Sequence, residues 1–513
     1  MRELSYTKNT IFLISAGVFS QIFGAVQKIV LTHYLKEEGM AVYQSAICVY
    51  SVFLTLAVSG IPFALTRLIS KEGESGRAYA AIGFALKTMC VLGAVLGILM
   101  YITRDFFSLA MKESGARYVI AALSPSVFAV AVGAVFKSCF EGHSNMLPCS
   151  ISQAAESFVK LILAYLFTAF LCVFSVKYAA VGAALALTLG EIFADFVLFL
   201  FFIPFLKGIK SAKKCRVSAE ILSFALPLAL YSLILSSLDL LENSVIRNSL
   251  AAISFSESSA NRLMREYRAY TAVFDNLCVS KRLTHEGTNW LYGAFFGYAQ
   301  IVIRFFSGLL RILCVSFFPL AARHFAQNRE KAAEAALSKI VRVMLGISVP
   351  LCAFLMIFGD RITYILFGSY AYYKMLVFSA PILIFAPLSS LFCTAEYASG
   401  KIFAPFLFGA ASFFVSIPLC AVLIGIPELN ILGAAVATIS GLVAELLLHL
   451  LFLKKKVKIG TGTVSAFYRA AVCALPASAV AVLIKILLKN CLISTVLAFF
   501  VFAAFCGIKK EES

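Results

Sequence analysis

The sequence predicts an all-α polytopic membrane protein with about fourteen transmembrane helices. Hydrophobic residues make up 61% of the 513 residues and charged residues only 14%, and the mean hydropathy is +0.93. The apolar residues gather into about fourteen blocks of roughly 18–28 residues, a length that crosses the ~30 Å hydrocarbon core of a bilayer as a helix. Short polar loops close each block, whereas a soluble protein of this size would show periodic apolar stripes.

The predicted spans follow one another with short connections. The first apolar run, from Lys8 to Tyr34, is too long for a cleaved signal peptide, so we expect a retained first span. In chain order the spans cover residues 10–35, 41–68, 78–102, 117–140, 149–174, 178–204, 219–246, 290–320, 341–358, 375–397, 402–426, 430–453, 467–488 and 491–508.

The spans group into two predicted lobes of six helices each. Residues 1–206 form an N-lobe, and residues 219–455 form a C-lobe that contains an external segment at 247–289. A basic cytoplasmic linker at 207–218 joins the lobes, and residues 456–513 hold the last two spans and a cytoplasmic tail.

Lysine and arginine predict the orientation in the membrane. They are concentrated in alternate loops, on the side that holds Lys8, Lys213 and Lys454. Because cytoplasmic loops carry the excess of Lys and Arg, both termini should be cytoplasmic. The segment 247–289 does not fit, since it falls on the outer side yet begins with Arg247 and carries further basic residues.

Composition excludes several classes of function. The net charge of +18 lies in loops between spans and not on a soluble face, so no nucleic-acid partner is expected. The fourteen cysteines contain no C-x-x-C pair and lie mostly in apolar spans, where they are interpreted as small packing residues. No G-x-x-x-x-G-K loop occurs, so the chain is not expected to hydrolyse ATP.

An internal repeat links the two lobes. The stretch Val181–Ala186 (VGAALA) in the sixth span matches Leu432–Ala437 (LGAAVA) in the twelfth, and Pro148 and Pro405 open the preceding spans. The copies lie six spans apart, so they share one orientation, as in transporters built from parallel repeats around a central substrate path. The alternative is that such small-residue runs simply serve close helix packing.

Cations inside the spans are the candidates for substrate binding, because a charge at bilayer depth usually faces a cavity or a partner. In the eighth span Gln300, Arg304, Ser307 and Arg311 share one helical face, which predicts either a cavity lining or burial against an acid. The predicted cavity residues are Arg304, Arg311, Gln300, Lys28, Lys87, Lys160, Glu156 and Arg67.

Each of these residues has a plainer interpretation. Glu156 and Lys160 are spaced i,i+4, so they are as well explained by a local ion pair. Lys28 and Arg67 lie near span ends, where snorkelling to the interface accounts for them. Lys87 is central in the third span and has no local partner in the sequence.

Paired acids at bilayer depth are candidates for cation coupling. Glu191 and Asp195 share a face of the sixth span, and Asp239 and Glu242 share a face of the seventh. Two like charges on one face in low dielectric favour uptake of a proton or of Na⁺. The alternative is that the intramembrane cations neutralise them.

Several stretches resemble a known family. Gly60–Ile69 (GIPFALTRLI), Phe140–Pro148 (FEGHSNMLP) followed by Ser152-Gln153, Leu291–Ala294 through Pro319, and Gly400-Lys401 through Ala435 are similar to polysaccharide transporters of the stage V sporulation protein B type. The resemblance covers nearly the whole chain. It places the chain in the multidrug/oligosaccharidyl-lipid/polysaccharide exporter (MOP) superfamily, which includes the lipid II flippases.

The resemblance implies two six-helix lobes around a central cavity, alternating access for an undecaprenyl-pyrophosphate-linked sugar, and two C-terminal helices that help to form a groove for the lipid tail. Two departures concern the cations. Gln21 stands where the family usually has Arg, and Arg304 stands where it usually has an uncharged polar residue. The cationic site is therefore expected to have moved from the first span to the eighth.

The leading hypothesis is a flippase that moves a lipid-linked oligosaccharide, such as lipid II or another polysaccharide precursor, from the inner to the outer leaflet, because Arg and Lys suit a phosphate headgroup. The alternatives are a cation-coupled multidrug exporter of the same fold and a membrane glycosyltransferase or acyltransferase. The enzyme alternative is disfavoured because the five histidines are scattered and are interpreted as structural.

The flippase hypothesis carries further expectations. The protein should be a monomeric multi-pass protein of a bacterial plasma membrane, with a role in peptidoglycan, cell-wall, capsule or sporulation polysaccharide. It should not be an enzyme and should need no cofactor or metal. Coupling to Na⁺, H⁺ or the membrane potential would supply its energy, and its partners should be the lipid-linked oligosaccharide and membrane lipids.

Overall fold

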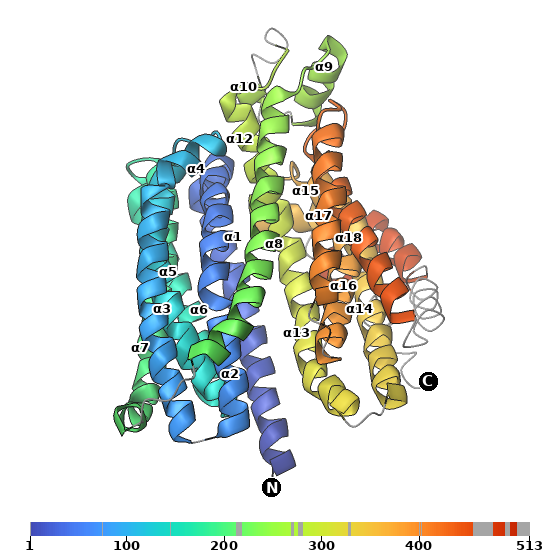
Figure 1. The fold of residues 1–513 in the computed structure, drawn as a ribbon. Helices are drawn as coiled ribbons and strands as arrows, with labels where there is room; N and C mark the ends of the chain where they lie inside the picture. Colours follow the sequence, from blue (N-terminus) through green and yellow to red (C-terminus); the bar gives the residue numbers. More distant parts are fainter. Residues whose placement is uncertain are drawn as a thin grey trace. The chain divides into compact units, whose positions relative to one another are not determined.

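The computed structural model describes residues 2–73, 75–143, 145–211, 218–267, 271–274, 281–326, 330–399, 401, 403–454, 474, 476–487 and 493–499. The described residues form helices joined by short turns, with one isolated antiparallel bridge between Ser254 and Arg282. The prediction of an all-α membrane protein is therefore confirmed (Figure 1).

The helices follow the predicted spans closely. In the first half they are α1 (Arg2–Val58), α2 (Ile61–Glu72), α3 (Gly76–Ile102), α4 (Arg104–Ala110), α5 (Ala116–Gly142), α6 (Leu147–Cys172), α7 (Val176–Ser211) and α8 (Ser218–Ala252). In the second half they are α9 (Glu257–Glu266), α10 (Thr271–Phe274), α12 (His285–Ala294), the π-helix η2 (Phe295–Ala299), α13 (Gln300–Ala326), α14 (Glu330–Phe367), α15 (Tyr373–Ser379), α16 (Ile382–Ala398), α17 (Phe403–Ile424) and α18 (Leu432–Lys454).

Within the described residues, 11 helical segments are long and apolar enough to cross a membrane. The first of them, Ile14–Glu72, contains both the first and the second predicted span, which are separated by a kink at Lys36 (φ 51°, ψ −165°). Of the predicted spans 467–488 and 491–508, the structure describes only residues 474, 476–487 and 493–499. The number fourteen therefore stays a prediction.

The chain divides into two compact units, Met1–Ser244 and Val245–Ser513, and the division falls inside α8. The lobe boundaries predicted at 207–218 and 456–513 remain a prediction. In the first unit, α5 packs against α1, α3 and α7, and α6 forms a hairpin with α7. In the second unit, α13 packs against α14 and α16, and α17 forms a hairpin with α18.

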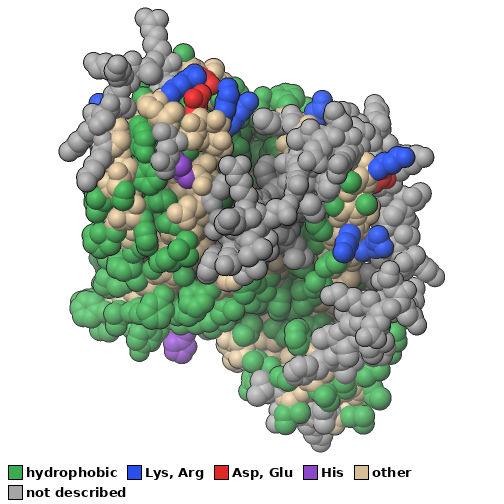
Figure 2. All heavy atoms as spheres, turned by 90° about the horizontal axis from the view of Figure 1, so that it is seen from below, with side chains coloured by type: hydrophobic (Ala, Val, Ile, Leu, Met, Phe, Trp, Pro, Cys, Tyr) green, Lys and Arg blue, Asp and Glu red, His purple; other side chains and the backbone are tan. Residues whose placement is uncertain are grey.

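The outer faces of the helices are apolar. On α3 the exposed side chains include Val91, Val95, Ile98 and Ile102, which are between 53% and 68% exposed. Figure 2 shows the molecule from below, where hydrophobic side chains cover much of the described surface and charged groups form a few small clusters. A surface of this kind is suited to contact with lipid and would aggregate in water.

The segment 247–289, which the orientation rule did not explain, begins as helix. Arg247 continues α8, is only 2% exposed, and donates from Nη2 to Asn289 Oδ1 at 2.7 Å. Beyond it, the rings of Tyr267, Phe274 and Trp290 pack together, with centroids 4.8–6.0 Å apart. Arg247 is therefore a buried, hydrogen-bonded side chain and carries little weight as a loop charge for orientation.

In both copies of the repeat, a glycine lies against the backbone of the preceding helix. Gly182 lies at the start of α7, where a Cβ would come within 2.7 Å of the Phe167 carbonyl oxygen on α6. Gly433 lies at the start of α18, where a Cβ would come within 2.7 Å of the Leu423 backbone on α17. In both hairpins the alanines that follow are fully buried. Small residues let the paired helices approach closely, as is common in membrane helix packing.

We predict that Gly182→Ala lowers the midpoint of thermal unfolding of the detergent-purified protein by several degrees, because overpacking against a backbone carbonyl costs about 1–3 kcal/mol. Gly24→Ala on α1 is the matched control, since a Cβ there meets nothing within 4 Å. Equal melting curves for the two variants would contradict this account of the hairpin.

Candidate functional site

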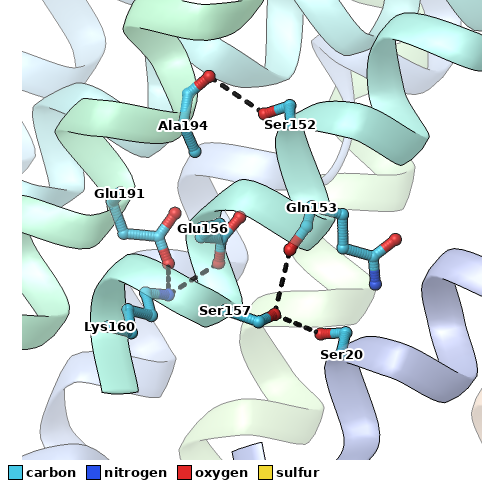
Figure 3. A network of polar contacts seen from close by, with 8 residues as sticks. All are labelled: Ser20, Ser152, Gln153, Glu156, Ser157, Lys160, Glu191 and Ala194. Carbon is cyan, nitrogen blue, oxygen red and sulfur yellow. Dashed lines mark hydrogen bonds and ion pairs between the residues drawn. The ribbon is translucent and has the colours of Figure 1, made fainter. Parts of the chain in front are cut away.

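A polar network joins α6, α7 and α1 inside the first unit (Figure 3). Lys160 Nζ lies 2.6 Å from Glu156 Oε1 and 2.6 Å from Glu191 Oε1, and the three side chains are 14%, 17% and 16% exposed. Gly190 makes room for this, because a Cβ there would overlap the Lys160 stem. One lysine thus serves two carboxylates, and a buried charge arranged in this way is satisfied within the protein.

Hydroxyl groups extend the network toward α1. Ser157 Oγ lies 2.7 Å from Ser20 Oγ and donates to the Gln153 carbonyl at 2.9 Å, while Ser152 Oγ donates to the Ala194 carbonyl of α7 at 2.9 Å. The local ion pair that the sequence offered as an alternative for Glu156 and Lys160 is present, and Glu191 is its third member.

The other predicted coupling acids have different surroundings. Asp195 lies one turn beyond Glu191 and packs its carboxylate on Gly133 of α5, and its buried Oδ2 has no hydrogen-bond partner within the described residues. On α8, Glu242 is 8% exposed, and the Asn243 side chain donates to the Asp239 carbonyl at 2.8 Å. The two acids of α7 therefore have different environments. Glu191 is paired with Lys160, whereas Asp195 Oδ2 has no hydrogen-bond partner within the described residues.

The predicted stripe on α13 combines buried and exposed groups. Gln300 is 8% exposed and donates to Ser379 Oγ at 3.1 Å, and Ser307 is also 8% exposed. Over residues 300–312, every one of which the structure describes, Arg304 and Arg311 are the two exposed residues. Neither guanidinium has an ion-pair partner within the described part of the chain. Of the two outcomes predicted for the stripe, burial against an acid does not occur there.

A cavity of about 300 Å³ lies between α2 and α8 in the first unit. The Arg67 guanidinium lies over the Phe224 ring at 4.6 Å, and Lys71 lines the same cavity. Glu220, also in the lining, is bound by Arg77 at 2.5 Å. Arg67 and Lys71 therefore present positive charge to the cavity with no carboxylate bound to either within the described residues.

The remaining predicted cations lie apart from these groups. Lys28 is exposed on α1, and Lys87 is exposed on α3, on the face that also carries Val91 and Val95. The predicted cavity residues are thus distributed over α1, α2, α3 and α6 of the first unit and α13 of the second.

Sequence reasoning missed a cluster in the second unit. His449 of α18 lies with Nδ1 2.8 Å from Glu396 Oε1 of α16 and with Nε2 3.6 Å from Glu445 Oε1. The His449 and Glu396 side chains are completely buried. The sequence predicts a structural role for His449 but does not indicate that Glu396 is its partner. The i,i+4 spacing of Glu445 and His449 in an apolar helix was the available signal, but Glu396 is 53 residues away.

A second missed contact joins α14 to the helix at Pro476–Leu487. Lys485 Nζ lies 2.7 Å from Asp360 Oδ1, and Arg361 Nη2 donates to the Lys485 carbonyl at 2.6 Å. Within the described residues, no group of His, Cys, Asp and Glu has the arrangement of a metal site.

Comparisons with known proteins agree with this architecture. The family model for polysaccharide biosynthesis proteins matches residues 6–251, and the model for the lipid II flippase MurJ matches residues 276–502. Stage V sporulation protein B of Bacillus subtilis (strain 168) is 25% identical over 470 residues, which cover 88% of this chain and 83% of that protein. Lipid II flippase MurJ of the same organism is 26% identical over 164 residues, which cover 29% of this chain and 30% of that protein.

Solved structures share the fold. A lipid II flippase MurJ in an inward closed conformation superposes with a TM-score of 0.68 at 15% identity, covering 98% of this chain and 99% of the other. An outward-facing multidrug resistance MATE family transporter of the MOP superfamily gives 0.63 at 14% identity, covering 88% and 96%. At these identities the likeness shows the fold alone.

The fold and the two family matches define a multi-pass membrane protein. The first half of the chain is similar to polysaccharide biosynthesis proteins and the second half to lipid II flippases, which supports the family that the sequence resemblance implied.

We predict that Lys160→Met destabilises the protein by about 3–5 kcal/mol, because it leaves two carboxylates buried together. Glu191→Gln should cost less, since Glu156 still pairs with the lysine. The triple variant K160M/E156Q/E191Q should recover most of the loss. Thermal unfolding in detergent measures all three, and unchanged stability in Lys160→Met together with lost transport would show that the network acts on substrate instead.

Proposed function

We propose that this protein is a flippase that moves an undecaprenyl-pyrophosphate-linked oligosaccharide from the inner to the outer leaflet of a bacterial plasma membrane by alternating access. Both termini are cytoplasmic in this proposal, and the protein acts as a monomer and is not an enzyme. The observation that carries it is the pair of exposed arginines on α13, which no acid within the described residues neutralises.

The physical argument is the cost of charge in hydrocarbon. A guanidinium at the centre of a membrane helix costs about 2.5–3.5 kcal/mol on insertion scales, so two of them facing lipid would destabilise the span. Arg304 and Arg311 lie two turns apart, and facing water they can bind an anionic headgroup. Arginine binds phosphate oxygens bidentately, and a diphosphate offers several such oxygens.

The cavity between α2 and α8 supports the same substrate chemistry. Arg67 and Lys71 lie one turn apart on α2, at the end of the span nearest the predicted cytoplasmic loop. A phosphate headgroup that enters from the cytoplasmic leaflet would meet these two cations first. The relatives named as flippases act on lipid II, which supports a lipid-linked precursor as the class of substrate.

We predict that Arg304→Ala and Arg311→Ala each abolish transport function while the protein still reaches the membrane, because each removes a headgroup contact and leaves the helix intact. The assay is complementation of a bacterial strain that depends on this protein or on an equivalent flippase. Arg342→Ala on α14 is the control, since Arg342 is exposed and, within the described residues, donates only to the Ser338 carbonyl of its own helix. Full function in both α13 variants would remove this helix from the substrate path.

Rescue of a strain depleted of its lipid II flippase identifies the substrate. Rescue by the wild-type chain would assign a peptidoglycan precursor. No rescue, with restored synthesis in a strain that lacks a capsule or other polysaccharide flippase, would assign another lipid-linked glycan. Failure in both strains at normal membrane levels would contradict the flippase proposal.

A further inference from the structure

The cavity between α2 and α8 has charge on one wall and hydrocarbon on another. Arg67 and Lys71 of α2 supply the charge, and apolar side chains of both helices, among them Leu68 and Ile221, supply the hydrocarbon. All of these residues belong to the first unit, so the cavity lies within one compact body. A lining of this kind suits an amphipathic anion, because it offers a partner to each half of the ligand.

Arg67 is held in place by an aromatic ring and not by an acceptor oxygen. Its guanidinium lies 4.6 Å from the centroid of the Phe224 ring, a contact that attracts the cation and orders its side chain. Within the described residues, Arg67 donates no hydrogen bond and pairs with no carboxylate, and the same is true of Lys71. The N–H donors of both side chains are therefore available to a phosphate.

The charges around the cavity leave one cation without a counterpart. Glu220 is the one acid among the described lining residues, and its Oε2 accepts a hydrogen bond from Arg77 Nη2 at 2.5 Å. Nη1 of the same guanidinium lies 3.1 Å from Glu72 Oε1. Over these described side chains, three cations thus face two carboxylates. The excess matches a phosphate diester, which carries a single negative charge, better than a diphosphate, which carries more.

The size of the cavity and its place on the chain also favour a phospholipid. Its volume of about 300 Å³ equals that of roughly ten water molecules, which accommodates a phosphate with its glycerol but not an oligosaccharide as well. It lies toward the end of α2 that precedes a predicted cytoplasmic loop, and anionic phospholipids gather in the cytoplasmic leaflet. On the same two helices, Phe63, Leu222 and Leu226 are 45% to 62% exposed, so acyl chains have an apolar surface to lie on.

We propose that the α2–α8 cavity binds the headgroup of one anionic phospholipid from the cytoplasmic leaflet. Arg67 and Lys71 hold its phosphate diester, and its acyl chains lie on the exposed apolar side chains of α2 and α8. The inference goes beyond the transport function proposed above and does not depend on it. A transported lipid whose diphosphate enters by this route would have to displace the phospholipid.

The test counts the lipids that the full chain retains when it is released from detergent into a native mass spectrometer. The protein is titrated with phosphatidylglycerol, with phosphatidylcholine and, separately, with a prenyl diphosphate. Wild-type protein should hold one phosphatidylglycerol more tightly than any further copy. Phosphatidylcholine should bind more weakly, because its choline cation meets the positive charge of the cavity.

Arg67→Gln and Lys71→Gln should each weaken phosphatidylglycerol binding about fivefold, and the double variant should weaken it about 25-fold. The matched control is the double variant K331Q/K339Q, which removes two exposed cations of α14 from the side that is also predicted to be cytoplasmic. Phosphatidylglycerol should raise the thermal unfolding midpoint of wild type and of this control, but not that of R67Q/K71Q. Equal midpoints without lipid would show that all three proteins fold.

Three outcomes would overturn the inference. Equal losses in R67Q/K71Q and K331Q/K339Q would mean that lipid is attracted by surface charge in general, and equal binding of the two phospholipids would mean that charge plays no part. Binding of the prenyl diphosphate at the cavity without binding of phosphatidylglycerol would assign the cavity to the transported lipid instead. A chain that retains phosphatidylglycerol but moves no prenyl diphosphate contradicts the transport function and leaves this site in place.

Discussion

A charge inside a hydrocarbon layer needs a partner or water, and this constraint organises the whole molecule. Lys160 satisfies two carboxylates in the core of the first unit, and Lys485 satisfies Asp360 in the second. Arg247 is buried and donates to Asn289. Arg304 and Arg311 differ from these groups, because they are exposed and no acid within the described residues binds them. A bound anion would supply the negative charge that these two guanidinium groups lack. Arg67 and Lys71 of α2 likewise have no carboxylate bound within the described residues.

The same constraint explains why the buried acids lie beside basic side chains. Glu191 belongs to the Lys160 network and is held in place by it. Glu396 and Glu445 face one histidine between them, just as Glu156 and Glu191 face one lysine. In both clusters a buried carboxylate has a basic side chain as its partner.

Close backbone contact holds each unit together where charge does not. Gly182 and Gly433 let two hairpins close on their own backbones, and the alanines after them are fully buried. Gly60, with φ at +85°, does the same at the start of α2, where a Cβ would come within 2.8 Å of the Ala225 carbonyl. Without a hydrophobic effect between helices in lipid, packing of this kind supplies much of the stability of a membrane fold.

The sequence by itself determined the fold class and most of the spans, because the length of an apolar block and the cost of loops in hydrocarbon are properties of the chain alone. The family was predicted from motifs such as Gly60–Ile69 and not from block length. The sequence also identified the Glu156–Lys160 pair, since an i,i+4 spacing is local. Only the tertiary structure decided that Glu191 completes that pair, that Glu396 meets His449 across 53 residues, and that Arg304 and Arg311 stay exposed while Gln300 is buried. These outcomes depend on which helices pack side by side and how they are rotated, and no local spacing encodes either.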